Sequence, residues 1–236
     1  WLAPAFIFTA LAFLIKPWAI FFFLPLLYLV YIKRQKKFWI KFVMFSLIAV
    51  LPFMLWRLWI LQQPESIPAS NWLFNGDGIR ARPAFFWWLI QERLGGEILG
   101  VSGLALFLIG LIWRAKNHFL HILVLSMMVY AVVVATGNVR HNYYQLILTP
   151  VLSIFMARGF VYLFKGNSDF IPRILTIGLA LFLLPLSFYF GWKHVKEFYK
   201  INNPPIIEAG KKADQILPKE AIVVAPYNGD TAFLYQ

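Results

Sequence analysis

The chain has 236 residues, of which 61% are hydrophobic and 14% charged, and its formal net charge is +12. A soluble domain carries about a quarter charged residues, so this composition, with a mean hydropathy of +0.69, excludes an ordinary soluble globular protein. The basic residues cluster between apolar runs, where they set topology and meet anionic head groups, so the charge does not indicate a nucleic-acid partner.

Seven apolar runs, most of them about 15 to 22 residues long, predict helices that cross a lipid bilayer. The predicted fold class is therefore mainly α, a polytopic transmembrane helical bundle of about seven spans within residues 1–192. The runs cover residues 2–15, 18–32, 38–61, 98–113, 119–136, 146–164 and 174–192.

A polar stretch at residues 62–97 separates the third and fourth runs and is rich in turn-forming residues. Within it, residues 83–94 predict an amphipathic helix that lies in the membrane interface. The aromatic residues expected in the interface are Phe85, Phe86, Trp87 and Trp88.

Lysine and arginine in the short connections predict the orientation, because such residues stay on the cytoplasmic side. Alternation of the spans places residues 33–41, 114–116 and 158–173 on one side, and all three are basic. We therefore expect a multi-pass plasma-membrane protein whose outer face carries the loop at 62–97 and everything after residue 192.

The tail at residues 193–236 is more polar and predicts the beginning of a soluble extracytoplasmic α/β domain. Pro205 is suited to the first turn of a helix, and the short β-branched run at 221–225 predicts a buried strand. The first residue, Trp1, already lies in an apolar run, so the chain is expected to be an internal piece of a longer protein.

The most distinctive polar cluster follows the fifth run and contains Arg140, His141, Tyr143 and Tyr144. Polar groups at a helix end in a membrane are costly unless they are paired or contact water or a ligand. One interpretation is an interfacial anchor, because Tyr and Arg favour head groups. The other is a binding site for an anionic, lipid-linked substrate, in which Arg140 grips a phosphate through two hydrogen bonds and the phenol rings offer a face to a sugar or lipid chain.

Further candidates lie on the same predicted side. Lys16, between the first two runs, can pair with a phosphate as a compact point charge or snorkel to the head groups, and for Arg57 snorkelling is the favoured interpretation. In the outer loop, Asp77, Arg80 and Arg82 are secondary candidates for substrate binding, although the surrounding residues mainly signal a turn.

Several short motifs resemble a family of membrane glycosyltransferases. They are residues 11–17 (Leu-Ala-Phe-Leu-Ile-Lys-Pro), 140–144 (Arg-His-Asn-Tyr-Tyr), Pro150, 156–159 (Met-Ala-Arg-Gly) and 221–224 (Ala-Ile-Val-Val). They are similar to the C-terminal half of GT-C fold, family 39 type enzymes that use polyprenyl-phosphate-linked sugars, such as protein O-mannosyltransferases and lipid A aminoarabinose transferases.

The resemblance implies inverting transfer of a sugar from a polyprenyl-phosphate donor to an acceptor lipid, glycan or protein on the outer face of the membrane. It carries donor contacts over to Lys16, Arg140, His141 and Tyr144. In that family the general base is an acidic residue that would precede Trp1, so no catalytic residue is expected in this chain, and the piece alone should be inactive.

Other readings stay open at this point. A lipid-linked oligosaccharide flippase, polymerase or ligase would also bind polyprenyl phosphates at helix ends, and a non-enzymatic membrane protein with an extracytoplasmic domain is the third alternative. An ion-coupled carrier is disfavoured because no carboxylate lies within an apolar run. No cofactor is identified. A divalent metal would suit the chemistry, but the chain has no cysteine, and no residue spacing indicates metal ligands.

Overall fold

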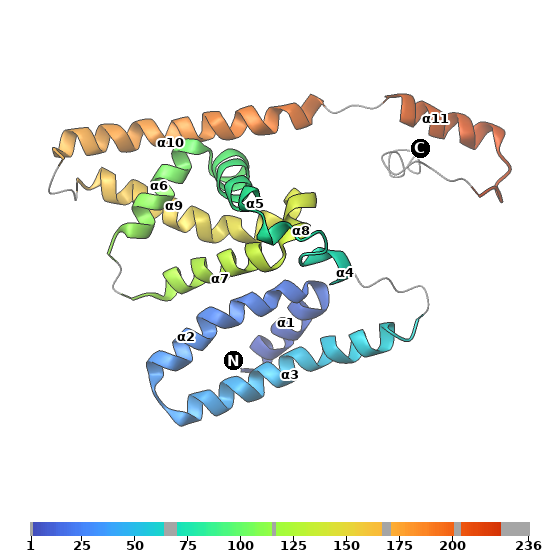
Figure 1. Cartoon of the computed structure of the whole chain (residues 1–236), viewed down its shortest axis with the longest axis horizontal. Coiled ribbons are helices and arrows are strands. Elements are labelled where there is room, and N and C mark those ends of the chain that lie inside the picture. The colour runs from blue at the N-terminus through green and yellow to red at the C-terminus, as the bar shows by residue number, and fades with distance from the viewer. Residues whose placement is uncertain (1, 64–69, 115–116, 167–170, 201–203, 223–236) are drawn as a thin grey trace. The chain divides into compact units, whose positions relative to one another are not determined.

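The computed structural model describes residues 2–63, 70–114, 117–166, 171–200 and 204–222. These residues are mostly helical and contain no strand, which confirms the prediction of a mainly α protein. The chain divides into two compact units, Trp1–Gly191 and Trp192–Gln236. Figure 1 shows the course of the helices.

The first unit begins with three apolar helices that pack as a group. Lys16 interrupts the first apolar run because it precedes Pro17, which favours extended backbone at the residue before it, and Lys16 has φ −147° and ψ 109°. The second helix ends at Arg34 in the left-handed conformation, and the third runs back beside the first (Figure 1). These elements are α1 (Leu2–Ile15), η1 (Pro17–Phe22), α2 (Phe23–Lys33) and α3 (Lys36–Ile60).

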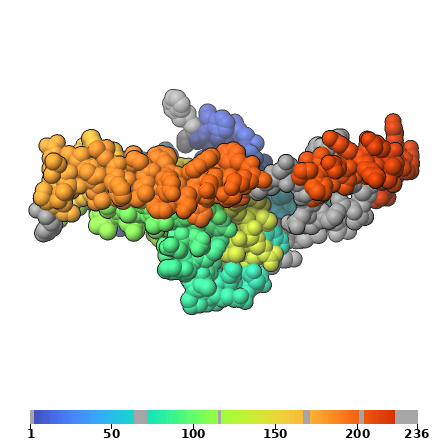
Figure 2. All heavy atoms as spheres, turned by 90° about the horizontal axis from the view of Figure 1, so that it is seen from above, coloured from blue at the N-terminus to red at the C-terminus, as the bar shows by residue number. Residues whose placement is uncertain are grey.

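The outer connection is helical over much of its described length. Its elements are α4 (Ser70–Leu73), η2 (Ile79–Ala81), α5 (Pro83–Trp88) and η3 (Leu89–Ile98), the last a π-helix. A helix is therefore confirmed at residues 83–94, and Figure 2 shows the α5–η3 segment protruding from the other helices of the unit. Its aromatic residues divide between two faces, because Phe85 is buried at 2% exposure whereas Phe86 and Trp87 are exposed.

The remaining helices of the first unit are α6 (Val101–Ile112), α7 (Phe119–Val133), α8 (Ala135–Arg140), η4 (Asn142–Leu148), α9 (Thr149–Phe164) and α10 (Arg173–Val195). Helix α6 turns by 108° from the α5–η3 segment. The turn occurs at Gly100, where φ is +68° and an added Cβ would lie 2.6 Å from the backbone oxygen of Ser187. Only glycine meets both conditions without strain.

Helices α6 and α9 form the closest helix pair of the unit because glycine faces glycine at their crossing. A Cβ at Gly110 would lie 1.9 Å from the backbone oxygen of Phe155, and one at Gly159 would lie 1.8 Å from the backbone oxygen of Leu106. Apolar helices gain packing contacts in a bilayer when small residues let their backbones approach. The pair therefore fixes where α9, and the η4 segment that leads into it, begin.

The seven predicted spans all fall on helical residues, but the structure supports fewer crossings by length. In the described part of the chain, three helices are long and apolar enough to cross a membrane: Lys36–Ile60, Asn142–Phe164 and one that begins at Arg173. A fourth is added if the bent pair of α5–η3 with α6 counts as one span. The apolar helices Ala3–Ile15, Pro17–Lys33 and Phe119–Val133 are shorter, because the run is broken at Lys16 and at Val134.

The second unit contains η5 (Lys196–Lys200) and α11 (Pro204–Ile216). The helix predicted from Pro205 is confirmed, and its first residue is Pro204. The predicted α/β tail is not supported by the described residues, since Ala221 and Ile222 are not in a strand. The rest of the strand expected at 221–225, and the turn that follows it, lie outside the described residues.

Candidate functional site

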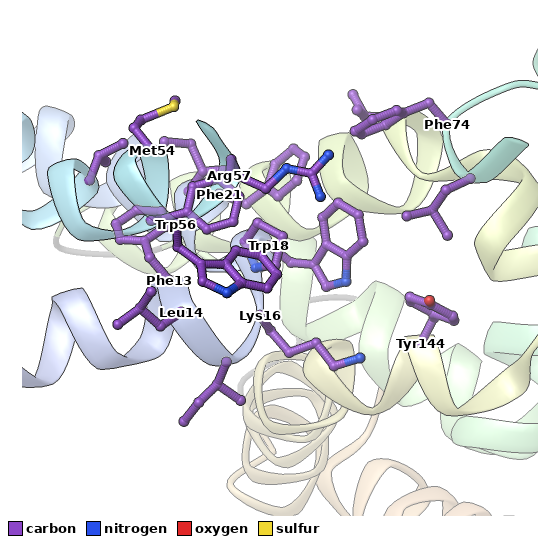
Figure 3. Close-up of a pocket in the computed structure, with 17 residues that line it drawn as sticks. Phe13, Leu14, Lys16, Trp18, Phe21, Met54, Trp56, Arg57, Phe74 and Tyr144 are labelled. Atoms are coloured by element: carbon purple, nitrogen blue, oxygen red, sulfur yellow. The ribbon is translucent and has the colours of Figure 1, made fainter. Parts of the chain in front are cut away.

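A cavity of about 590 Å³ lies between the C-terminal ends of α1 and α3 and the η1 segment (Figure 3). Ligand pockets generally measure about 300–1,000 Å³. Most of its wall is apolar, and Leu73, Phe74, Val133 and Tyr144 come to it from the later part of the chain. The apolar and aromatic residues from α1, η1 and α3 are Phe13, Leu14, Ile15, Pro17, Trp18, Ile20, Phe21, Val50, Phe53, Met54 and Trp56.

Two cations belong to the cavity wall, Lys16 and Arg57. Arg57 lies in the last turn of α3, where a positive charge interacts favourably with the helix dipole. In Figure 3 the charged ends of both side chains extend to the side of the cavity where Trp18 and Tyr144 lie, whereas Leu14 and Met54 lie on the other side. Neither cation has a carboxylate oxygen within 4.0 Å in the part of the chain that the structure describes.

Trp18 adds a hydrogen-bond donor beside these cations. Its ring centroid lies 5.9 Å from that of Phe74 and 6.2 Å from that of Tyr144, which fixes the indole in the wall. The indole Nε1 is buried and has no hydrogen-bond partner among the residues that the structure describes. A buried donor without an acceptor costs about 1–3 kcal/mol, so an acceptor oxygen brought by a ligand would stabilise this arrangement.

The rings of the predicted cluster at 140–144 lie against one another beside the cavity, with His141 also 6.0 Å from Tyr144 between centroids. The Nζ of Lys16 lies 5.4 Å from the ring centroid of Tyr144, and Tyr144 stacks on Tyr143 at 4.8 Å between centroids. Tyr143 stacks in turn on His141 at 5.2 Å. Lys16 is thereby brought to a cluster more than a hundred residues away in sequence.

The ring cluster also contacts Trp72 of α4. The His141 ring meets Trp72 edge-on at 6.1 Å, and the guanidinium of Arg140 lies 5.5 Å from the Trp72 centroid. Of the five predicted binding residues, Lys16 and Tyr144 line the cavity, whereas Arg140, His141 and Tyr143 are outside its wall. The structure therefore places the five in one neighbourhood but not in one pocket.

Asp77 joins this neighbourhood through two contacts. The Thr136 hydroxyl donates a 2.6 Å hydrogen bond to its carboxylate, and Arg140 lies 3.9 Å away. The Thr136 hydrogen bond, helped by the Arg140 charge, holds the pKa of Asp77 below its ordinary value. Because the Asp77 and Arg140 side chains are 40% and 55% exposed, their ion pair contributes little to stability.

Arg80, a secondary candidate, is engaged with the backbone. Its guanidinium donates to the backbone oxygens of Val132 at 2.8 Å, Val133 at 2.5 Å and Phe74 at 3.1 Å. It therefore caps the C-terminal end of α7, which is where cations stabilise a helix. Arg82 is exposed, and its guanidinium lies 3.5 Å from the backbone oxygen of Asp77.

Sequence reasoning missed Trp18 and placed Arg57 among snorkelling residues, yet both belong to the cavity wall. The sequence feature that could have indicated Arg57 is its position: Lys16 and Arg57 both lie at the ends of apolar runs, on the same predicted side of the membrane. No three His, Asp or Glu side chains of the described ranges come together in a way that would hold a metal ion.

Comparisons with models of protein families, with curated proteins and with solved structures return no match for this chain. The fold and the site by themselves define a helical protein with helices long and apolar enough to cross a membrane. Its apolar cavity carries two cations, neither of which forms a salt bridge within the described residues.

Proposed function

We propose that this chain belongs to an integral-membrane glycosyltransferase that takes a sugar from a polyprenyl-phosphate donor. The observation that carries the proposal is the cavity, whose wall is apolar except for Lys16, Arg57 and the polar atoms of Trp18 and Tyr144. A ligand that matches it has a hydrocarbon tail and an anionic head, and a lipid phosphate has both.

In this proposal each part of the donor lies against a different part of the cavity. The first isoprene units lie against the side where Phe13, Leu14 and Met54 form the wall, and the longer part of the chain extends into lipid. The phosphate lies between Lys16 and Arg57, whose charges have no carboxylate partner in the described residues.

The sugar then lies over the rings of His141, Tyr143 and Tyr144 beside the cavity. Tyr143 is 52% exposed and next to Tyr144, so it offers an accessible aromatic face. Arg140 and His141 belong to the same cluster, and in this proposal they donate hydrogen bonds to sugar hydroxyls or to a second phosphate oxygen.

The reaction in this proposal is an inverting transfer. A general base removes the proton of an acceptor hydroxyl, the hydroxyl oxygen bonds to the anomeric carbon, and the bond from that carbon to the phosphate oxygen breaks. Lys16 and Arg57 stabilise the negative charge that gathers on the departing lipid phosphate. The general base in this proposal is an acidic residue, and the acceptor is a lipid, a glycan or a protein.

In this proposal the short apolar helices complete a seven-span bundle in the plasma membrane. The cavity, the outer loop and the tail then face outward. The same cavity would serve a flippase, but both of its cations extend to one side, and carriage of a phosphate across the bilayer needs polar groups along the path. This favours the transferase.

The binding step is tested directly by native mass spectrometry of the chain in lipid nanodiscs with polyprenyl phosphate. We expect the Lys16→Gln, Arg57→Gln double variant to lose at least about tenfold in affinity, since each removed charge contacts the phosphate. The matched control is the Lys211→Gln, Lys212→Gln variant on the exposed face of α11. Equal binding by the double variant and the control would refute the site.

The transfer step is tested in membranes that contain the protein as the cell makes it. Sugar transfer from a polyprenyl-phosphate donor, absent with a nucleotide sugar and lost in Lys16→Gln, Arg57→Gln at normal expression, would support the enzyme. Movement of labelled lipid across the bilayer without transfer would point to the flippase. If neither sugar transfer nor movement of labelled lipid were detected, the alternative of a non-enzymatic membrane protein would remain.

A further inference from the structure

Three connections between helices lie on the side of the first unit that is opposite the cavity. The helix ends that flank the α2–α3, α6–α7 and α9–α10 connections are spread along the left side of the unit in Figure 1. The Tyr28 hydroxyl of α2 accepts a 3.3 Å hydrogen bond from the backbone N–H of His118, which ties α2 to the second connection. Arg158 of α9 donates at 2.8 Å to the backbone oxygen of Trp113, which ties α9 to the second.

The described residues of this end carry charge of one sign, and Asp169 of the α9–α10 connection lies outside the described ranges. This end includes eight exposed lysines and arginines and no Asp or Glu among its described residues. No salt bridge of the described residues involves any of the eight. Together they form what we call the basic surface: Lys33, Arg34, Lys36, Lys37, Lys41, Arg114, Lys165 and Arg173.

Two of the helices that begin at this surface have cations but no anion in their first turns. Helix α3 begins at Lys36, with a second lysine at 37, no acidic residue in its first turn and no side-chain cap. Helix α10 begins at Arg173, also without an acidic residue in its first turn. The N-terminal end of a helix carries partial positive charge, so cations there raise the energy of the fold unless an anion is present.

The position of the surface along α3 indicates where that anion comes from. Lys37 and Arg57 are 20 residues apart on this helix, which corresponds to about 30 Å at 1.5 Å per residue. This is about the thickness of the hydrocarbon core of a bilayer. Only 6% of the 18-residue apolar window within α3 is buried by the protein, so a bilayer crossed by α3 would place Lys37 and Arg57 at its two head-group layers.

Exposed aromatic residues lie beside the lysines and arginines of the basic surface. Tyr31 and Trp39 flank the α2–α3 connection and are 60% and 39% exposed. Tyr and Trp favour the interface between hydrocarbon and water, because each has an apolar body and a polar end. A surface of cations beside such rings fits the head groups of lipids.

We propose that the basic surface binds anionic phospholipids, with phosphates of the leaflet lying beside its exposed lysines and arginines. The site differs from the cavity in its ligand and in its place across the membrane, and the proposal holds whether or not the chain belongs to a glycosyltransferase. Bound phosphates offset the repulsion among neighbouring cations of the surface, in the way that basic residues next to a span attract acidic lipid.

The test compares lipid adducts of the full chain by native mass spectrometry, after reconstitution with equal amounts of phosphatidylglycerol and phosphatidylcholine. We expect preferential retention of phosphatidylglycerol. It should fall by about tenfold or more in the variant Lys33→Gln, Arg34→Gln, Lys37→Gln, because three phosphate contacts are removed. The matched control removes three exposed lysines elsewhere, as Lys211→Gln, Lys212→Gln, Lys219→Gln, and should retain the preference.

Two further measurements distinguish lipid binding from a folding defect and from binding of free phosphate. The variant Lys33→Arg, Lys37→Arg keeps the charge and should bind as the parent does. Inorganic phosphate at millimolar concentration should not displace the lipid. Equal retention of the two lipids, an equal loss in the control, or displacement by inorganic phosphate would each overturn the proposal. Binding of polyprenyl phosphate in the cavity should be unchanged in the basic-surface variant, so failure of one proposal is distinguishable from failure of the other.

Discussion

The contact between α6 and α9 gives the sharpest test of the packing. Gly110 and Gly159 face each other, and a methyl group at either would lie within 2 Å of a backbone oxygen of the other helix. A backbone oxygen cannot rotate away as a side chain can, so Gly159→Ala requires the two helices to separate.

The expected change in the free energy of unfolding of Gly159→Ala follows from two opposing effects. Alanine is favoured over glycine in a helix by about 1 kcal/mol, whereas overpacking a close contact costs about 1–3 kcal/mol and more when backbone must move. The separation also weakens the hydrogen bonds that Arg158 donates to the backbone oxygens of Gly110 and Trp113. We therefore expect Gly159→Ala to lose about 2–3 kcal/mol of unfolding free energy.

The chain provides matched controls on α10. An added Cβ at Gly178 or Gly191 would have nothing within 4 Å, so the same substitution there keeps only the helix-propensity gain and should be neutral or slightly stabilising. The assay is thermal or denaturant unfolding of each variant in the same detergent. Gly159→Ala as stable as Gly178→Ala would refute the close helix contact.

Three other predictions concern the outer segments. Arg80→Ala should cost about 2 kcal/mol in the same unfolding assay, because buried carbonyls at the end of α7 lose a charged donor, and an unchanged stability would contradict the capping role. Since the pKa of Asp77 is lowered in the folded protein, its carboxylate stabilises the fold above its ordinary pKa of 3.8, and this contribution is lost as pH falls below that value. Asp77→Asn should remove that part of the pH dependence, with the Thr136→Val variant as a second test of its main cause. Phe85→Ala should cost about 3–5 kcal/mol, whereas Trp87→Ala, at an exposed position, should leave unfolding nearly unchanged and weaken only partition into lipid vesicles; the reverse order would contradict the observed faces of α5.

The sequence by itself determined the class of protein and the helical segments. Seven apolar runs predicted helices, and each of the seven falls on helical residues, because hydrophobicity over a window is a local property. The predicted seven membrane crossings are not supported. In the described ranges three helices, or four if the bent pair counts as one span, are long and apolar enough to cross, because Ala3–Ile15, Pro17–Lys33 and Phe119–Val133 are shorter.

Only the tertiary structure decided which polar residues share a site. Lys16 and Tyr144 were predicted separately and meet at the cavity, and Arg57 and Trp18 join them although no motif indicated it. Arg80 was a secondary candidate for substrate binding in the sequence, yet its guanidinium donates to backbone oxygens of α7. A residue type shows which contacts a side chain can make, whereas its partners depend on how distant helices pack, and that packing is set by non-local contacts such as the Gly110–Gly159 crossing.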